Sequence, residues 1–326
     1  SFILALTYLI VSEDQNCRAN NTSESCLMPI RGRGIHVIEG PAQKAMMYFE
    51  ETLEMAEDVR AMWLLNVSAM AAGEYPDGVA EQYRLAPGAF ESQESFPRFL
   101  NVAMPAGLDR MSLCGGSVVD DLDGDGLLDV MVSSWGPGDQ LGIYVNDGQG
   151  MFRETTEEAG ITGIYGGINL NQADYDNDGD VDVFVMRGAW LFGNGHHPNS
   201  LLRNDGNGRF GDVTFDAGLG NALYPTQTSA WSDYDNDGNL DLLVGNEFNP
   251  IQLFRNNGDG TLVDVAADAG LVGSHFTKAV MWGDYDNDRY PDIYVSNLDA
   301  PNQLYHNKGD GTFIDVAADA GVTEPL

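Results

Sequence analysis

Basic side chains are scarce in this sequence. Lysine and arginine together number 16 among 326 residues, against 50 aspartates and glutamates, and the formal net charge at pH 7 is −34. A chain of this charge repels phosphate backbones, which excludes nucleic-acid binding as a function class. Apolar residues make up 43% of the chain and aromatic residues 10%, more than a disordered acidic tail contains. The sequence therefore describes a folded protein in which the excess of carboxylates has a local cause.

Long apolar runs and cysteines are also few. No run reaches the roughly 18 residues needed to cross a bilayer. The apolar stretch Ser1–Val11 lacks the basic start of an intact signal peptide, and we expect it to be helical, a strand being the alternative. Cys17 and Cys26 flank a polar stretch and suit a small disulfide loop, the alternative being two unpaired thiols. Cys114 has no obvious partner, and we expect a buried thiol.

Four acidic clusters organise the second part of the chain. A short apolar run follows each cluster, then an Asn/Gly turn typical of β-hairpins, such as NDGQG, and then a closing segment such as DAGL. Residues 97–326 are therefore predicted to be four copies of a roughly 50–60-residue all-β unit. Units of this length are too long for a β-solenoid and too short for tandem sandwiches, which favours blades of a β-propeller. The clusters are Asp121–Asp129, Asp174–Asp182, Asp233–Asp241 and Asp284–Asp292.

Residues 1–96 differ in kind from the repeats. Between Pro41 and Ala72 apolar residues recur at helical spacing, and the glycine and proline of Gly73–Asp77 end the pattern. We expect a small helical module over residues 1–96, joined by a linker to the β repeats of residues 97–326.

Every cluster has the form D-x-D-x-D-x-x-x-D, which predicts a loop that binds Ca²⁺. A hard cation takes six to eight oxygens, and aspartates at positions 1, 3, 5 and 9 with the backbone carbonyl of position 7 supply them. An EF-hand is excluded because position 12 is valine rather than glutamate in all four copies. The predicted ligands are Asp121, Asp123, Asp125, Leu127 and Asp129; Asp174, Asp176, Asp178, Asp180 and Asp182; Asp233, Asp235, Asp237, Asn239 and Asp241; Asp284, Asp286, Asp288, Tyr290 and Asp292.

Position 6 of such a loop needs a positive φ angle, which suits glycine. Three copies have glycine there, whereas the fourth has Arg289, so we expect the fourth site to bind its ion most weakly. Ca²⁺ is preferred over Mg²⁺, which takes fewer carboxylates and keeps more of its water. A fully coordinated Ca²⁺ leaves no open position for a substrate, so we expect about four structural ions and no catalytic metal.

These residues resemble the FG-GAP/VCBS repeat of integrin-α-like propellers. The resemblance rests on GGSVVDDLDGDGLLDVMVSSWG, GINLNQADYDNDGDVDVFVMRGAW and WSDYDNDGNLDLLVGNE. With CLMPI and RAMWLLNVSAMAAGEYPDGV in the helical part, the chain is similar to bacterial exported relatives of the cartilage acidic protein family, which join a TPR-like region to such repeats. The resemblance implies a ring of about seven blades, of which this chain would be a part, a closed four-bladed ring being the alternative. It implies no catalytic residues.

Three functions compete at this point. The favoured one is a non-enzymatic, calcium-stabilised binding or scaffold protein for protein or glycan partners. We expect it to be bacterial and to lie outside the cytoplasm, where Ca²⁺ is abundant: secreted, at the cell surface or in the periplasm. The alternatives are a structural subunit of a surface filament and a carbohydrate-active enzyme using a propeller cleft, which would need an acid/base pair that the sequence does not display. Four tryptophans near the loops, Trp135, Trp190, Trp231 and Trp282, are expected to pack between blades, the alternative being ligand binding at a propeller mouth.

Overall fold

A computed structural model describes the chain at residues 1–18, 20, 22, 24–25, 28–90, 99–110, 112–191, 194–298 and 300–324. These residues form two compact units, Ser1–Met104 and Pro105–Leu326. The boundary predicted between residues 96 and 97 lies outside the described residues.

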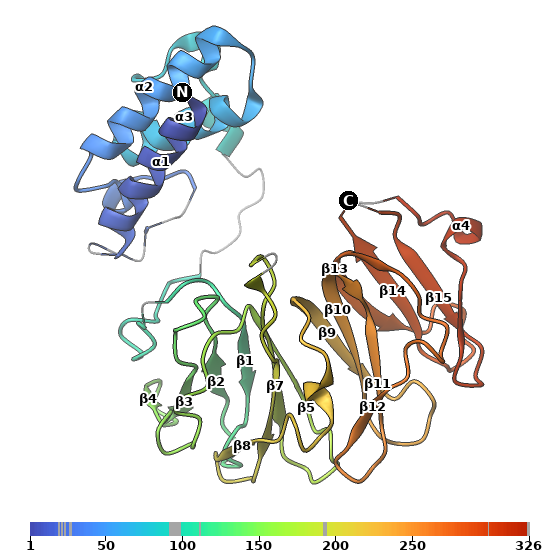
Figure 1. The fold of residues 1–326 in the computed structure, drawn as a ribbon. Coiled ribbons are helices and arrows are strands. Elements are labelled where there is room, and N and C mark those ends of the chain that lie inside the picture. Colours follow the sequence, from blue (N-terminus) through green and yellow to red (C-terminus); the bar gives the residue numbers. More distant parts are fainter. Residues whose placement is uncertain are drawn as a thin grey trace. The chain divides into compact units, whose positions relative to one another are not determined.

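The first unit contains three helices that pack in chain order: α1 (Phe2–Glu13), α2 (Gly40–Met55) and α3 (Val59–Ala71) (Figure 1). Helix α2 buries one face through residues three or four positions apart, namely Ala42, Ala45, Met46, Phe49 and Leu53. The predicted helix over Ser1–Val11 is present as α1. Short turns of 3₁₀ helix lie at Gly32–Gly34, Glu81–Tyr83 and Pro87–Phe90, and a π turn lies at Asp14–Arg18.

The continuous helical pattern predicted from Pro41 to Ala72 is interrupted in the structure. Helix α2 ends at Met55, and Asp58 starts α3 by accepting the backbone N–H groups of Arg60 and Ala61. An aspartate in this position satisfies N–H groups that the first helical turn leaves free, so it favours a new start over a continued helix.

The second unit is built from sixteen strands in its described residues. They are β1 (Ser117–Asp120), β2 (Asp129–Val132), β3 (Gly142–Asn146), β4 (Phe152–Glu154), β5 (Asn169–Ala173), β6 (Asp182–Met186), β7 (Ser200–Asn204), β8 (Phe210–Asp212), β9 (Thr226–Ser232), β10 (Asp241–Pro250), β11 (Gln252–Asn256), β12 (Leu262–Asp264), β13 (Ser274–Gly283), β14 (Asp292–Asn297), β15 (Gln303–Asn307) and β16 (Phe313–Asp315). A 3₁₀ turn lies at Leu219–Asn221, and a short helix, α4, at Ala317–Ala320.

The strands form four antiparallel meanders of four strands each, one for every acidic cluster (Figure 1). The first two meanders are separate sheets, β1 to β4 and β5 to β8. The third and fourth are joined because β10 is long: its first half pairs with β9, and Glu247 to Pro250 pair with the start of β13. The meanders succeed one another through their first strands, since β1 contacts β5, β5 contacts β9, and β9 contacts β13.

The hydrophobic core of this unit lies between successive meanders rather than within one of them. One buried cluster joins Val118 and Met131 of the first meander to Val183 and Leu202 of the second, and two similar clusters follow at the next junctions. Short meanders that bury their faces against each other are the blades of a propeller-like fold. The predicted fold class, mainly β with a helical module in front, is confirmed.

No helix in the described parts of the chain is long and apolar enough to span a membrane.

Candidate metal centres

Each acidic cluster forms the turn between the first and second strands of its meander, and the aspartates at positions 1 and 5 hold the turn closed. In the third loop, Asp233 accepts the backbone N–H groups of Asp237 and Gly238, each at 2.9 Å. Asp237 accepts the N–H group of Asn239 at 2.8 Å. The same three hydrogen bonds recur in the other loops. Carboxylates that bind their own backbone in this way give the loop its shape before any ion is considered.

Position 6 has a positive φ in all four loops, as predicted. The glycines have φ between 87° and 96°, and Arg289 adopts 78° in the fourth loop. Position 4 is also left-handed, which the sequence reasoning missed: φ is 78° at Gly124 and 58° to 64° at the asparagines of the other loops. The signal was present, because glycine and asparagine are the residues that tolerate this conformation.

The aspartate at position 9 is the first residue of the second strand and is almost completely buried. In the third loop, the two oxygens of Asp241 accept the backbone N–H groups of Tyr234, at 3.2 Å, and of Asn256, at 2.8 Å. Equivalent bonds are made by Asp129, Asp182 and Asp292. This carboxylate therefore ties the loop to the third strand of the same meander.

The folding of each loop brings together three of the predicted ligands, those at positions 1, 3 and 9. One oxygen from each lies within 4.8 Å of the others in all four loops. Within the described residues, the position 5 aspartates of the first three loops are not part of these groups. The convergent sets are Asp121, Asp123 and Asp129; Asp174, Asp176 and Asp182; Asp233, Asp235 and Asp241; Asp284, Asp286 and Asp292.

Two of the convergent carboxylates carry an oxygen that the protein does not satisfy. Oδ1 of Asp176 and Oδ1 of Asp235 are buried and have no hydrogen-bond partner among the described residues. A buried oxygen without a partner costs free energy, and a cation between the three carboxylates removes that cost. The residues present therefore fit a metal ion with oxygen ligands.

Burial also disfavours the ionised form of these carboxylates in the absence of an ion. It raises the pKa of Asp182 and of Asp241 to about 7, although the backbone N–H groups that they accept act in the opposite direction. Burial likewise raises the pKa of Asp176 and of Asp235, and the neighbouring aspartates raise it further. Groups crowded in this way are stabilised as carboxylates by a bound cation.

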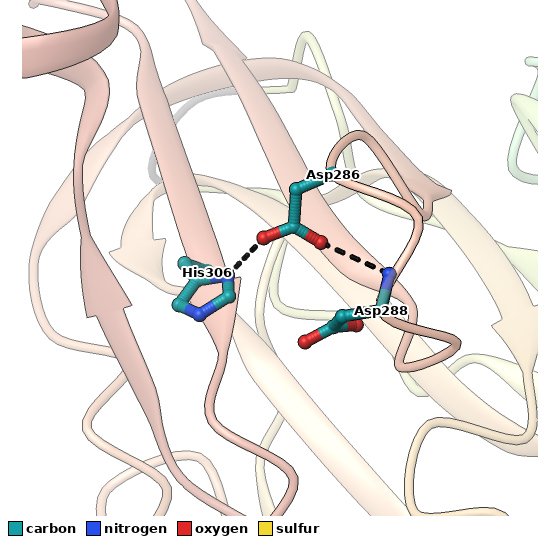
Figure 2. A group of neighbouring side chains, drawn as sticks. All are labelled: Asp286, Asp288 and His306. Atoms are coloured by element: carbon teal, nitrogen blue, oxygen red, sulfur yellow. Dashed lines mark hydrogen bonds and ion pairs between the residues drawn. The ribbon is translucent and has the colours of Figure 1, made fainter.

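The fourth loop differs from the others because a histidine lies beside it. Figure 2 shows His306, from β15, facing Asp286, with Asp288 on the same loop. One potential ligand atom from each of these three residues lies within 4.8 Å of the others. His306 is not among the ligands predicted from the sequence. Its signal was its place just before the asparagine that ends the third strand, a place held by Val145, Arg203 and Arg255 in the other copies.

A model of the FG-GAP-like repeat matches residues 121–185, 233–295 and 284–324, which together contain all four acidic loops. The chain carries FG-GAP-like repeats. Cartilage acidic protein 1 of Mus musculus and of Homo sapiens is 25% identical to it over 267 residues, which cover 74% of this chain and 41% and 40% of the two relatives. The chain thus spans less than half the length of these relatives.

Among solved structures, BBS1N in complex with ARL6DN matches with a TM-score of 0.39 and 15% identity, over 63% of this chain and 57% of that chain. The Vibrio cholerae (V. cholerae) biofilm matrix protein Bap1 matches with a TM-score of 0.36 and 15% identity, over 62% of this chain and 30% of that chain. The resemblance of the acidic loops to FG-GAP repeats, and the distant similarity to cartilage acidic protein, are confirmed.

The cysteine predictions have separate outcomes. The predicted disulfide between Cys17 and Cys26 stays a prediction, because Cys26 lies outside the described residues. The expectation of a buried thiol at Cys114 is wrong: this side chain is exposed, in the turn that leads into β1.

The tryptophans near the FG-GAP-like loops also differ among themselves. Trp282 stacks on Tyr234 and Trp231 lies against Tyr175, as expected for packing between meanders. The indole N–H of Trp135 donates to the carbonyl of Ala189 in the next meander. Trp190 does not pack in this way, since 56% of its surface is exposed.

Proposed function

We propose that this protein is a non-enzymatic, calcium-stabilised binding or scaffold protein that works outside the cytoplasm. The observation that carries the calcium assignment is the recurrence of one loop four times, each with three carboxylates converging within 4.8 Å. The unpartnered buried oxygens of Asp176 and Asp235 support it. Converging carboxylate oxygens are the ligands that Ca²⁺ prefers. When bound, the ion neutralises the carboxylates of its loop and fixes the turn against the strands that follow.

The energetics of such sites supports this location. At a Ca²⁺ concentration about 100-fold above the Kd, one site stabilises the fold by about 2.7 kcal/mol. Weak structural sites fill at the millimolar Ca²⁺ found outside cells and stay empty at cytosolic levels. A fold that depends on several of them is therefore suited to an extracytoplasmic compartment.

The binding surface that we assign is an aromatic patch made of Trp190, Phe248 and Phe276. It lies at the opposite end of the strands from the acidic loops, because Trp190 follows the end of β6, Phe248 is near the end of β10, and Phe276 is near the start of β13. Phe248 and Phe276 stack with ring centroids 4.8 Å apart. Trp190 and Phe248 are each 56% exposed, and both have a positive φ, of 68° and 55°. Non-glycine residues held in this strained conformation cluster at binding sites.

Polar groups surround the patch in a fixed arrangement. Lys278 lies over the rings of Trp190 and Phe276, and it donates to the side-chain oxygen of Gln227, which the indole N–H of Trp190 also contacts. Glu247 is 2% exposed and accepts the backbone N–H of Trp190. Glu247 thus holds Trp190 in place from below, and the exposed aromatic faces beside an amide and an ammonium suit the apolar faces and hydroxyl groups of a sugar, so we assign glycans as the ligand class.

A glycan array and titration calorimetry in millimolar Ca²⁺ test this assignment. We expect binding to at least one glycan, and we expect Trp190→Ala and Phe248→Ala to weaken it by at least about tenfold, or 1.4 kcal/mol. Phe215→Ala is the matched control, since Phe215 is an exposed aromatic residue outside the patch.

Three outcomes would contradict parts of the proposal. Glycan binding unaffected by both patch variants would move the site elsewhere, and turnover of a bound glycan would favour the carbohydrate-active enzyme. Concentration-dependent filaments with no ligand bound would favour the structural subunit.

A further inference from the structure

Among the described residues, a nitrogen ligand lies within reach of the fourth acidic loop and of none of the other three. Ile293 pairs with Tyr305 between β14 and β15, and this register sets His306 level with Asp292 at the base of the loop. The same register in the other meanders sets Val145, Arg203 and Arg255 level with their position 9 aspartates. Neither a valine nor a permanently protonated guanidinium can bind a metal ion.

The ring nitrogen Nδ1 of His306 points into the loop. It lies 3.3 Å from Oδ2 of Asp286 and 3.3 Å from Oδ1 of Asp292 (Figure 2 shows the contact with Asp286). The nitrogen atom itself is buried, and its geometry toward the described residues satisfies no hydrogen bond. These contacts are ion pairs when the imidazole is protonated, and a metal ion bound at Nδ1 takes the place of that proton.

We infer that the fourth loop binds a transition-metal ion of the Zn²⁺ type through His306, Asp286 and Asp288. Imidazole nitrogen suits Zn²⁺ and its neighbours in the first transition series, whereas Ca²⁺ takes oxygen ligands. The Asp286 and His306 side chains are 34% and 28% exposed, so the site lies at the surface although the Nδ1 atom itself is buried, and water completes the coordination of a bound ion.

This site overlaps the calcium site of the same loop because Asp286 belongs to both groups of converging ligands. The two ions therefore compete in the fourth loop, whereas no histidine of the described ranges converges on the first three loops. The inference does not depend on the glycan assignment, and it adds a second metal to a loop in which Arg289 already departs from the glycine of the other copies.

The test is calorimetric titration of the full chain with ZnCl₂ in millimolar Ca²⁺, after chelator has removed any transition metal, with Mg²⁺ as a control ion. We expect one Zn²⁺ per chain. We expect His306→Arg, which installs the residue of the second and third meanders, and His306→Gln to abolish this binding or to weaken it by at least about tenfold. His196 and His197 lie in the segment between β6 and β7, in a different meander from the fourth loop, so the double variant His196→Gln with His197→Gln is the matched control and is expected to bind Zn²⁺ as the unchanged protein does.

The stabilisation by Ca²⁺ is measured on the same variants. We expect it to persist, because His306 lies beside the fourth loop and the other three loops are unchanged. Absence of Zn²⁺ binding, or Zn²⁺ binding that survives both His306 variants, would overturn the inference while leaving the calcium proposal intact. If Ca²⁺ does not stabilise the unchanged protein, the calcium proposal alone is overturned.

Discussion

The side-chain amide of Asn307, in β15, donates to the backbone carbonyl of Tyr234 in the acidic loop of the preceding meander, over 2.9 Å. Asn256 makes the same contact with Tyr175, and Asn204 makes it with Leu122. The backbone N–H of each asparagine is accepted by the position 9 aspartate of its own loop. One asparagine in each of the second, third and fourth repeats therefore connects two successive acidic loops, so the order of one loop affects the packing of the next meander.

This connection predicts that removing one such asparagine side chain lowers the free energy of unfolding. Asn256→Ala removes the donor and leaves the buried carbonyl of Tyr175 without it, and we expect the free energy of unfolding to fall by about 1–3 kcal/mol. Urea unfolding in millimolar Ca²⁺ measures this change. The adjacent Asn257→Ala is the matched control, because the side chain of Asn257 is exposed, and we expect it to change stability by less than about 0.5 kcal/mol. Equal effects of the two variants would contradict the connection.

Replacing the arginine at position 6 of the fourth loop by glycine is predicted to stabilise the protein. Arg289 holds a φ of 78°, a conformation that costs a non-glycine residue about 1 kcal/mol. We expect Arg289→Gly to raise the free energy of unfolding by about that amount and to tighten Ca²⁺ binding in this loop, since a positive charge is also removed. The converse variant, Gly238→Arg in the third loop, is expected to have the opposite effect. Destabilisation by Arg289→Gly would show that the arginine makes a favourable contact.

The buried carboxylates predict opposite pH dependences with and without Ca²⁺. In the metal-free protein, burial raises the pKa of Asp182 and Asp241 to about 7, above the value of about 3.9 in an unfolded chain. Protonation of these groups therefore favours the folded state, and the stability it contributes is complete below about pH 4 and lost as the pH rises through about 7. A bound Ca²⁺ holds the same groups ionised, which lowers their pKa and reverses the sign.

The measurement is the Tm by circular dichroism from about pH 5 to about pH 7.5, in EGTA and in millimolar Ca²⁺. We expect the Tm in EGTA to fall across this range and the Tm in Ca²⁺ to rise or stay level. A metal-free Tm that rises with pH would contradict the assignment of these two aspartates.

Much of the candidate site could be predicted from the sequence because its signals are local. The spacing of the aspartates places them on one turn, and the glycines at position 6 mark where that turn needs a positive φ. His306 could not be placed beside the fourth loop in this way, since it is brought there by the pairing of β15 with β14. The pairing sets His306 level with the position 9 aspartate, where the other repeats have valine or arginine.

Some features of the fold could not be predicted from the sequence either, because they depend on pairing between distant segments. The sharing of β10 between two meanders depends on Glu247 to Pro250 pairing with β13, which no local pattern distinguishes from an ordinary strand end. The exposure of Trp190 depends on its positive φ and on the neighbours contributed by β9, β10 and β13. By contrast, the break between α2 and α3 had a local signal in Asp58, whose short acceptor side chain favours the start of a helix.

The most direct test of the account is thermal unfolding of the chain in millimolar Ca²⁺, in excess EGTA, and in EGTA with Mg²⁺ added. If the acidic loops are structural calcium sites, removal of Ca²⁺ lowers the Tm by roughly 10 °C or more, because several sites each contribute about 2.7 kcal/mol. Restored Ca²⁺ recovers the Tm, and Mg²⁺ does not. An identical Tm under all three conditions would contradict the account, since Ca²⁺ bound to the four loops would then contribute nothing to the stability of the fold.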